Sequence, residues 1–194
     1  MRHHIGRTLV CVVAFFSVAC REKGPPEPGD AAAEPQRADA MAAAPEAAQA
    51  AFNAIGGLAG DWTGHIGRKD TTNPAQVSFR LTAKGSAILE RMIIEDPVEM
   101  VSVYHFEKGA LVLSHYCAAG NHPRMVLSRG SAEGPMRFAL SGAQVLDTAR
   151  EVHMHSYELN PVGSDQLQIV WQTFVNGKRE GQDTMFLMRR ATNR

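Results

Sequence analysis

The sequence predicts an all-β fold, an antiparallel up-and-down barrel of about 8–10 strands that follows one short helix. Short runs in which apolar and polar residues alternate follow one another from residue 60 onwards. Turn residues separate these runs at regular intervals, and Lys108-Gly109 and Asn176-Gly177 have the composition of tight hairpin turns. Many short strands at such even spacing are typical of a sandwich or a barrel.

The helix is expected over residues 47–58, where Phe52, Ile55 and Leu58 recur at helical spacing. Gly56 and Gly57 are expected to end it. A β-rich region begins at Asp61. The alternating runs then predict strands at 77–81, 86–95, 100–107, 110–117, 124–128, 136–140, 152–159, 166–175 and 184–189. The segment 141–150 fits a loop or a helical turn. The folded domain is therefore expected over residues 47–194.

The first 19 residues have the pattern of a signal peptide. Arg2 and Arg7 supply a positive start, and the apolar run 8–19 is too short to remain as a membrane-spanning helix. The four residues at 17–20, Ser-Val-Ala-Cys, resemble the bacterial lipobox, in which the cysteine becomes the lipidated first residue of the mature chain. This resemblance implies lipidation of Cys20. Ordinary cleavage after residue 19, which would give a soluble secreted protein, is the alternative.

Residues 20–46 combine the anchor cysteine with a segment rich in Ala, Pro and Glu. Such a composition buries too little apolar surface to offset its conformational entropy, so we expect a disordered tether. Residue 21 is Arg and not the Asp of the inner-membrane retention signal. The resemblance thus implies the cell envelope, with an anchor on the periplasmic face of the outer membrane, or else a periplasmic or secreted protein.

Composition limits the partners that the chain can have. The formal net charge is zero, which gives no indication of a nucleic-acid partner. The chain has three cysteines, Cys11, Cys20 and Cys117. If Cys11 is removed with the signal peptide and Cys20 is lipidated, Cys117 is the single thiol of the mature chain, which excludes an intramolecular disulfide.

The start of the β-rich region carries a family resemblance. Gly60-Asp61-Trp62 after a short helix is similar to the opening of lipocalins and other calycins, and the stretch 58–64 resembles the start of nitrobindin-like haem-binding barrels. In calycins this tryptophan closes one end of the barrel and packs on a basic residue of the last strand. The resemblance implies that role for Trp62, with Arg189 or Arg190 as its partner.

A two-residue turn at Lys108-Gly109 fixes the register of the hairpin 100–117. Tyr104 then faces Leu113, and Ser102 faces His115. The face with the larger apolar side chains belongs inside the barrel, so His115 and Cys117 should point inward and His105 outward.

These positions define a candidate site for a small molecule. The inward residues would lie beside a polar loop, and Arg124 on that loop could orient a carboxylate. We predict non-catalytic binding of an apolar or carboxylate-bearing ligand. The candidate ligand-binding residues are Tyr104, His115, Cys117, Asn121, His122 and Arg124.

The same residues allow other functions. His115 and Cys117, joined by His122, could bind a metal, and a late histidine such as His155 could hold haem as in nitrobindin-like barrels. His153 and His155 are instead expected to face solvent, with Met154 opposite Trp171. A Cys117 thiolate with a histidine base lacks the accompanying groups of a catalytic site. No catalytic residue, metal ligand or cofactor is therefore assigned, and a structural envelope protein without a ligand is a further alternative.

Overall fold

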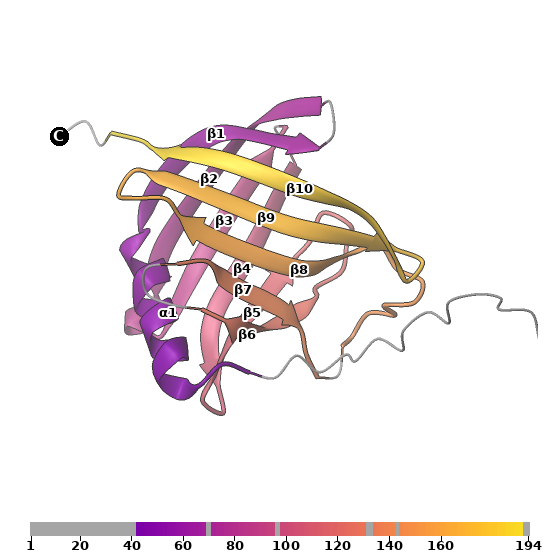
Figure 1. Cartoon of the computed structure of the whole chain (residues 1–194), viewed down its shortest axis with the longest axis horizontal. Helices are drawn as coiled ribbons and strands as arrows, with labels where there is room; N and C mark the ends of the chain where they lie inside the picture. The colour runs from indigo at the N-terminus through magenta and orange to yellow at the C-terminus, as the bar shows by residue number, and fades with distance from the viewer. Residues whose placement is uncertain (1–41, 69–70, 96–97, 131–133, 143, 192–194) are drawn as a thin grey trace, which may run out of the picture. The chain divides into compact units, whose positions relative to one another are not determined.

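A computed structural model describes residues 42–68, 71–95, 98–130, 134–142 and 144–191. They form a closed antiparallel barrel of ten strands in the order β1-β10-β9-β8-β7-β6-β5-β4-β3-β2, so each strand pairs with its neighbours in sequence and the last closes on the first. Figure 1 shows this meander and the single helix beside it. The predicted fold class is confirmed, whereas the signal peptide, Cys20 and nearly all of the tether lie outside the described residues.

The elements follow the predicted order closely. Their bounds are α1 (Pro45–Gly57), β1 (Gly60–Arg68), β2 (Thr71–Thr82), η1 (Ala83–Gly85), β3 (Ala87–Ile94), β4 (Val98–Glu107), β5 (Ala110–Tyr116), β6 (Arg124–Arg129), β7 (Met136–Leu140), β8 (His153–Pro161), β9 (Gln166–Val175) and β10 (Lys178–Arg189). The last strand is longer than its predicted core of 184–189, because its polar first half, 178–183, pairs with β9 across the Asn176-Gly177 turn.

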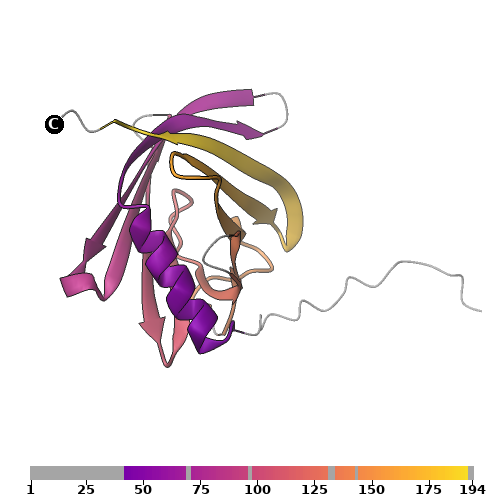
Figure 2. The same ribbon diagram turned by 60° about the vertical axis from the view of Figure 1, so that its left-hand side comes forward.

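The helix α1 closes one end of the barrel. Its apolar face is buried, with Ala51 and Ile55 fully enclosed, and the Phe52 ring lies 5.3 Å from the ring of Phe106 at the end of β4. The backbone N–H of Ala43 donates to Leu127 O of β6 at 2.8 Å. Figures 1 and 2 show the helix at this end. Within the described residues no helix has the length and apolar character needed to span a membrane.

Trp62 occupies the place that the calycin resemblance implies. Its side chain is buried, its Nε1–H donates to Leu58 O at 2.9 Å, and the Arg189 guanidinium lies 4.4 Å from the ring centroid. Trp62 and Arg189 are direct partners in the β1–β10 ladder. The closed meander and this contact fit a calycin-like barrel, with Arg189 and not Arg190 on the tryptophan.

The hairpin register predicted from the Lys108-Gly109 turn is confirmed. Tyr104 pairs with Leu113 and Ser102 pairs with His115. Both turn residues have positive φ, 50° and 85°, as a two-residue hairpin turn requires. The inward face of β4 and β5 is therefore the predicted one.

The segment between β7 and β8 lies over the outside of β5 and β6. The side-chain amide of Gln144 donates to Arg124 O at 2.8 Å and accepts from Arg124 N–H at 3.0 Å. Val112 and Val126 point away from the barrel interior and are nevertheless buried, as is Leu146 of this segment. The expectation of a loop for residues 141–150 agrees with the turns observed there.

Candidate functional site

A row of polar side chains crosses the barrel interior on three adjacent strands. Glu90 of β3 lies opposite Ser102 of β4, and Ser102 lies opposite His115 of β5. All three are almost fully buried. Polar groups in a barrel core need partners, so the hydrogen bonds of each residue indicate what the site can do.

Glu90 is held by two phenols from different parts of the sheet. Tyr104 donates a short hydrogen bond to Glu90 Oε2, and Tyr157 of β8 donates to Glu90 Oε1 at 2.9 Å. The Phe138 ring packs edge-on against Tyr104, with 5.5 Å between centroids. Burial raises the pKa of Glu90 from 4.5 to about 7, although both tyrosine hydrogen bonds act in the opposite direction. The carboxyl therefore exchanges its proton near neutral pH.

His115 has only half of its hydrogen-bonding capacity filled. Ser102 Oγ lies 3.0 Å from His115 Nδ1, while Nε2 is buried and has no hydrogen-bond partner among the described residues. Burial lowers the pKa of His115 from 6.5 to about 4, so the ring is neutral at pH 7. The serine hydroxyl can donate or accept. Nε2 is accordingly available as either an acceptor or a donor, depending on the tautomer.

Methionines surround this row on the side away from α1. Met92 follows Glu90 on the inner face of β3 and lies opposite Met100, which precedes Ser102 on β4. Met154 of β8 belongs to the same core. Because unbranched thioether side chains change rotamer at low cost, this layer can reshape around a bound molecule.

The structure brings together only part of the predicted site. Tyr104 and His115 lie in the core at neighbouring levels of the β4–β5 hairpin, and Cys117 packs against the same core, half-buried, one step further from α1. Burial raises the pKa of the Cys117 thiol. These three residues agree with their predicted inward orientation. Their role in binding a ligand stays a prediction.

The loop residues lie apart from the interior. The Asn121 amide donates to Val152 O at 2.7 Å, and the His122 ring stacks at 6.0 Å on the exposed Tyr116. Arg124 pairs with Ser114 on the outward face of β5. Its guanidinium forms an ion pair with Glu107 at 2.7 Å and also donates to Ser141 O. The structure thus does not aim Arg124 at the barrel interior, because strand alternation sends its side chain outward.

The histidine pair of β8 differs from its prediction. Met154 lies opposite Thr173, and Trp171 lies opposite Tyr157, so the predicted pairing of Met154 with Trp171 is wrong. His153 is buried with 1% of its surface exposed, and its Nδ1–H donates to Glu151 O. His155 stacks on Phe174 at 3.8 Å. The expectation that both imidazoles face solvent is therefore wrong for His153.

No cluster of three His, Cys, Asp or Glu side chains able to hold a metal occurs in the part of the chain that the structure describes. His122 stacks on an outward-facing tyrosine, so it does not approach the inward His115. The grouping on which the metal hypothesis relied is thus not formed.

Sequence reasoning missed three of the interior polar residues. Ser102 was placed opposite His115 but was not considered as its hydrogen-bond partner. Glu90 falls in an apolar run with Ile88 and Met92 on the same face, and that alternation was the signal for its inward orientation. Tyr157 was beyond local patterns, because its contact with Glu90 joins strands on opposite parts of the barrel.

Comparisons with known proteins give a likeness of fold. No protein-family model matches the chain, and no curated protein matches it. Among solved structures, a protein of unknown function of the DUF3598 family from Nostoc punctiforme aligns with TM-score 0.50 and 12% identity, over 70% of this chain and 49% of that one. The structure of EF1p2_mFAP2b bound to DFHBI aligns with TM-score 0.35 and 12% identity, over 72% of this chain and 98% of that one. The chain spans about half the length of the Nostoc protein, and at this identity the likeness concerns the barrel fold alone.

Proposed function

We propose that the barrel binds a small, neutral and largely apolar molecule in its interior, without catalysis. The observation that carries this proposal is the buried Nε2 of His115, which has no partner within the described residues. A buried polar group without a hydrogen bond costs about 1–3 kcal/mol. A hydroxyl or carbonyl of a ligand would supply the missing bond and recover that cost.

The interior favours an uncharged ligand over a carboxylate. The buried polar and charged residues of the described chain are Glu90, Ser102, His115 and His153, with no lysine or arginine among them. The His115 ring is neutral because burial lowers its pKa. A ligand carboxylate would enter an apolar barrel without a cationic partner, at a large desolvation cost.

The methionine layer supports binding on the side of His115 away from α1. Met92 and Met100 are cross-strand partners next to the Glu90–Ser102 pair, and Met154 belongs to the same core. Their flexibility allows a ligand to be accommodated by side-chain rearrangement. Cys117, next on the inner face of β5, would lie on the entry side of such a ligand.

The same proposal includes the cell envelope. A lipid anchor at Cys20, followed by a tether to the barrel, is supported by the lipobox resemblance and the composition of residues 20–46. Metabolic labelling with a fatty-acid analogue should mark the wild type and not Cys20→Ser. A wild-type protein that takes up no label would contradict the anchor.

Binding can be tested with Nile red, a neutral apolar dye that carries a carbonyl. The full chain is titrated with the dye, and its fluorescence gives the dissociation constant. Removal of the hydrogen-bonding imidazole in His115→Leu should weaken binding about tenfold, the equivalent of one lost hydrogen bond. The matched control is His122→Leu, because His122 lies outside the barrel. Both variants keep the N-terminal segment, so only the barrel differs between them.

Two outcomes would overturn the proposal. Equal affinities of His115→Leu and His122→Leu would show that the dye does not use the interior. A protein that binds neither the dye nor any small molecule retained in native mass spectrometry after isolation from its envelope would favour a structural role.

A further inference from the structure

An apolar surface lies on the outside of the barrel, over β1, β10 and the β8–β9 turn. Val162, Phe186 and Met188 each leave about half of their surface exposed. They line a hollow of about 320 Å³ together with His65, whose ring lies 5.8 Å from that of Phe186. Large apolar side chains that cluster on an outer face mark a contact with another apolar phase.

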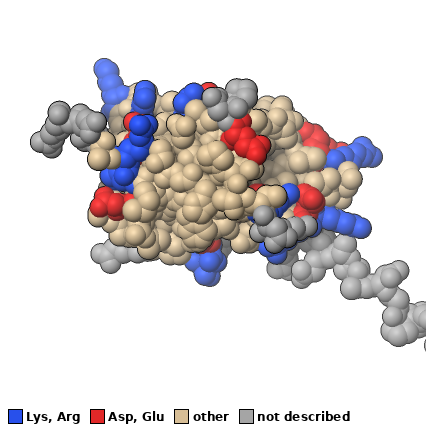
Figure 3. Space-filling view, turned by 90° about the horizontal axis from the view of Figure 1, so that it is seen from above, with Lys and Arg blue, Asp and Glu red and all other residues tan. Residues whose placement is uncertain are grey.

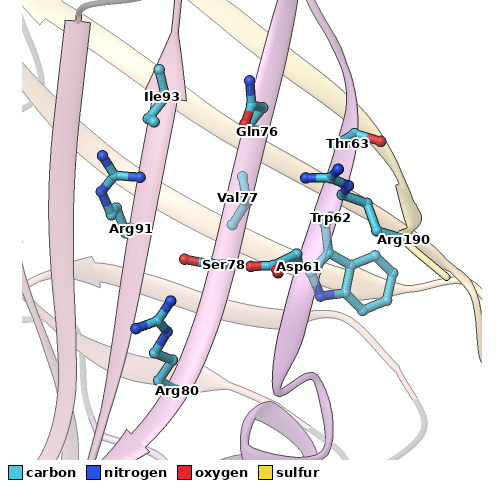
Figure 4. A pocket seen from close by; sticks show the side chains of 10 residues that line it. All are labelled: Asp61, Trp62, Thr63, Gln76, Val77, Ser78, Arg80, Arg91, Ile93 and Arg190. Atoms are coloured by element: carbon cyan, nitrogen blue, oxygen red, sulfur yellow. The ribbon is translucent and has the colours of Figure 1, made fainter. Parts of the chain in front are cut away.

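A basic hollow adjoins this surface over β1, β2 and β3. It measures about 120 Å³, and Figure 4 shows Arg80, Arg91 and Arg190 standing around Ser78 and Asp61. Arg91 forms a two-point ion pair with Glu99, with both distances 2.7 Å. Neither Arg80 nor Arg190 forms an ion pair with any described residue. The three arginines of this hollow have two carboxylates near them, Asp61 and the Glu99 that pairs with Arg91. One positive charge is therefore in excess among these residues.

The two hollows form one continuous surface. Met188 and Arg190 are two positions apart and share the outer face at the end of β10. Thr63, which lines the basic hollow, is the direct partner of Met188 in the β1–β10 ladder. The backbone N–H of Arg190 donates to Asp61 O at 2.8 Å and continues that ladder. Figure 3 shows this side of the molecule, where Lys and Arg stand at both ends with some Asp and Glu beside them and a broad area between them carries no charged side chain.

We propose that this β1–β10 surface docks on a bilayer that contains anionic phospholipid. Val162, Phe186 and Met188 would enter the boundary between head groups and acyl chains, and Arg80 and Arg190 would pair with lipid phosphates. The pairing is complementary in charge, because Arg80 and Arg190 form no ion pair with any described residue and Arg190 follows Met188 by two positions. Interfacial binding of this kind combines buried apolar area with attraction to anionic lipid.

The proposal is tested with a tryptophan reporter in the full chain reconstituted in vesicles. Phe186→Trp places an indole on the docking surface, whereas Trp62 and Trp171 are buried at 1% and 7% exposure. Tyr116→Trp is the matched control, because Tyr116 is exposed to a similar degree, 54% against 50%, on β5. The vesicles contain phosphatidylglycerol and phosphatidylcholine that is brominated in its acyl chains, which quenches indoles that reach the acyl region.

We expect the reporter of Phe186→Trp to be quenched and that of Tyr116→Trp to remain bright. Adding Arg80→Gln and Arg190→Gln, or omitting phosphatidylglycerol, should abolish most of the quenching, since electrostatic attraction to the surface is lost. Adding His115→Leu should leave the quenching unchanged, because docking does not use the barrel interior. Docking can therefore fail or succeed independently of ligand binding.

Three results would overturn the proposal. Equal quenching of the two reporters would mean that the barrel meets the bilayer in no preferred orientation. Quenching that survives the two arginine substitutions would remove the role of the phosphates. A blue shift of the Phe186→Trp emission with protein concentration in the absence of vesicles would show that a second copy of the chain covers the surface.

Discussion

The phenol of Tyr157 donates a 2.9 Å hydrogen bond to Glu90 Oε1 across the interior of the barrel. The two residues belong to β8 and β3, which are not neighbours in the sheet. Tyr104 occupies the other oxygen of the same carboxyl. A polar connection therefore runs through the core beside the Ser102–His115 pair, and its protonation state is coupled to folding.

The first prediction concerns stability against pH. The pKa of Glu90 is about 7 in the folded protein against 4.5 as its ordinary value, because burial disfavours the charged form. The folded state thus binds more protons between these values. The stabilising contribution of protonated Glu90 to the free energy of unfolding is fully present below pH 4.5. It is lost as the pH rises through 7, and the total decrease is about 3 kcal/mol. In Glu90→Gln this decrease should be absent, as urea unfolding at a series of pH values will show.

The comparison must be made with the wild type at each pH. His115 has a lowered pKa of about 4, so its contribution is present above pH 6.5 and lost as the pH falls through 4, the opposite direction. It is common to both proteins and cancels in the difference. The exposed Glu95→Gln serves as the control and should follow the wild type. Parallel curves for Glu90→Gln and the wild type would contradict an elevated pKa.

The second prediction isolates the Tyr157 hydroxyl. Tyr157→Phe keeps the ring and removes one donor to Glu90, so the free energy of unfolding at pH 7 should fall by about 1–3 kcal/mol. Because that hydrogen bond opposes the effect of burial on the Glu90 pKa, its loss should move the pH midpoint of the Glu90 effect upward. Tyr116→Phe, on the exposed face of β5, should change neither quantity. A midpoint that stays in place would mean that the bond does not stabilise the carboxylate.

The sequence was informative where local rules decide the structure. The Lys108-Gly109 turn fixed the pairing of Ser102 with His115, because a two-residue turn permits one register. The same alternation places Arg124 outward, opposite Ser114, but the prediction treated it as part of a loop. Ile88, Glu90 and Met92 alternate with their neighbours in the sequence too, within the strand expected at 86–95, but Glu90 was not counted among the site residues.

Other features depend on contacts that no local pattern encodes. The connection between β8 and β9 is longer than a two-residue turn, so the sequence did not fix the register that places Tyr157 opposite Trp171 and Met154 opposite Thr173. His153 is buried and donates to Glu151 O in the preceding loop, a contact that strand alternation does not predict. The meeting of Tyr157 with Glu90 requires closure of the whole barrel. Such long-range contacts set the chemistry of the interior, and this is why the candidate site was predicted only in part.

The third prediction concerns the closing contact at Trp62. Arg189 stacks on the indole, and its guanidinium nitrogens also donate to the carbonyl oxygens of Ala59, at 2.9 Å, and of Gly57 and Ser164, at 3.3 Å. The compact ammonium of a lysine cannot reach these acceptors together. Arg189→Lys should therefore lower the free energy of unfolding by about 1–2 kcal/mol in urea titrations followed by tryptophan fluorescence. Arg190→Lys is the neighbouring control and should leave the free energy of unfolding unchanged. An unchanged free energy of unfolding in Arg189→Lys would show that only the positive charge at this position matters.

The fourth prediction compares two glycines. A Cβ at Gly64 would lie 1.9 Å from the backbone oxygen of Phe186, so β1 and β10 approach too closely there for any side chain. A Cβ at Gly57, near the end of α1, would meet nothing within 4 Å. Gly64→Ala should destabilise the barrel by about 3 kcal/mol or prevent folding, because backbone atoms of two paired strands must separate. Gly57→Ala should be neutral or stabilise by up to about 1 kcal/mol, since alanine favours the helix.

Thermal unfolding of Gly64→Ala and Gly57→Ala gives the comparison. Tolerance of alanine at position 64 would mean that the ladder between Gly64 and Leu187 is looser than the structure shows.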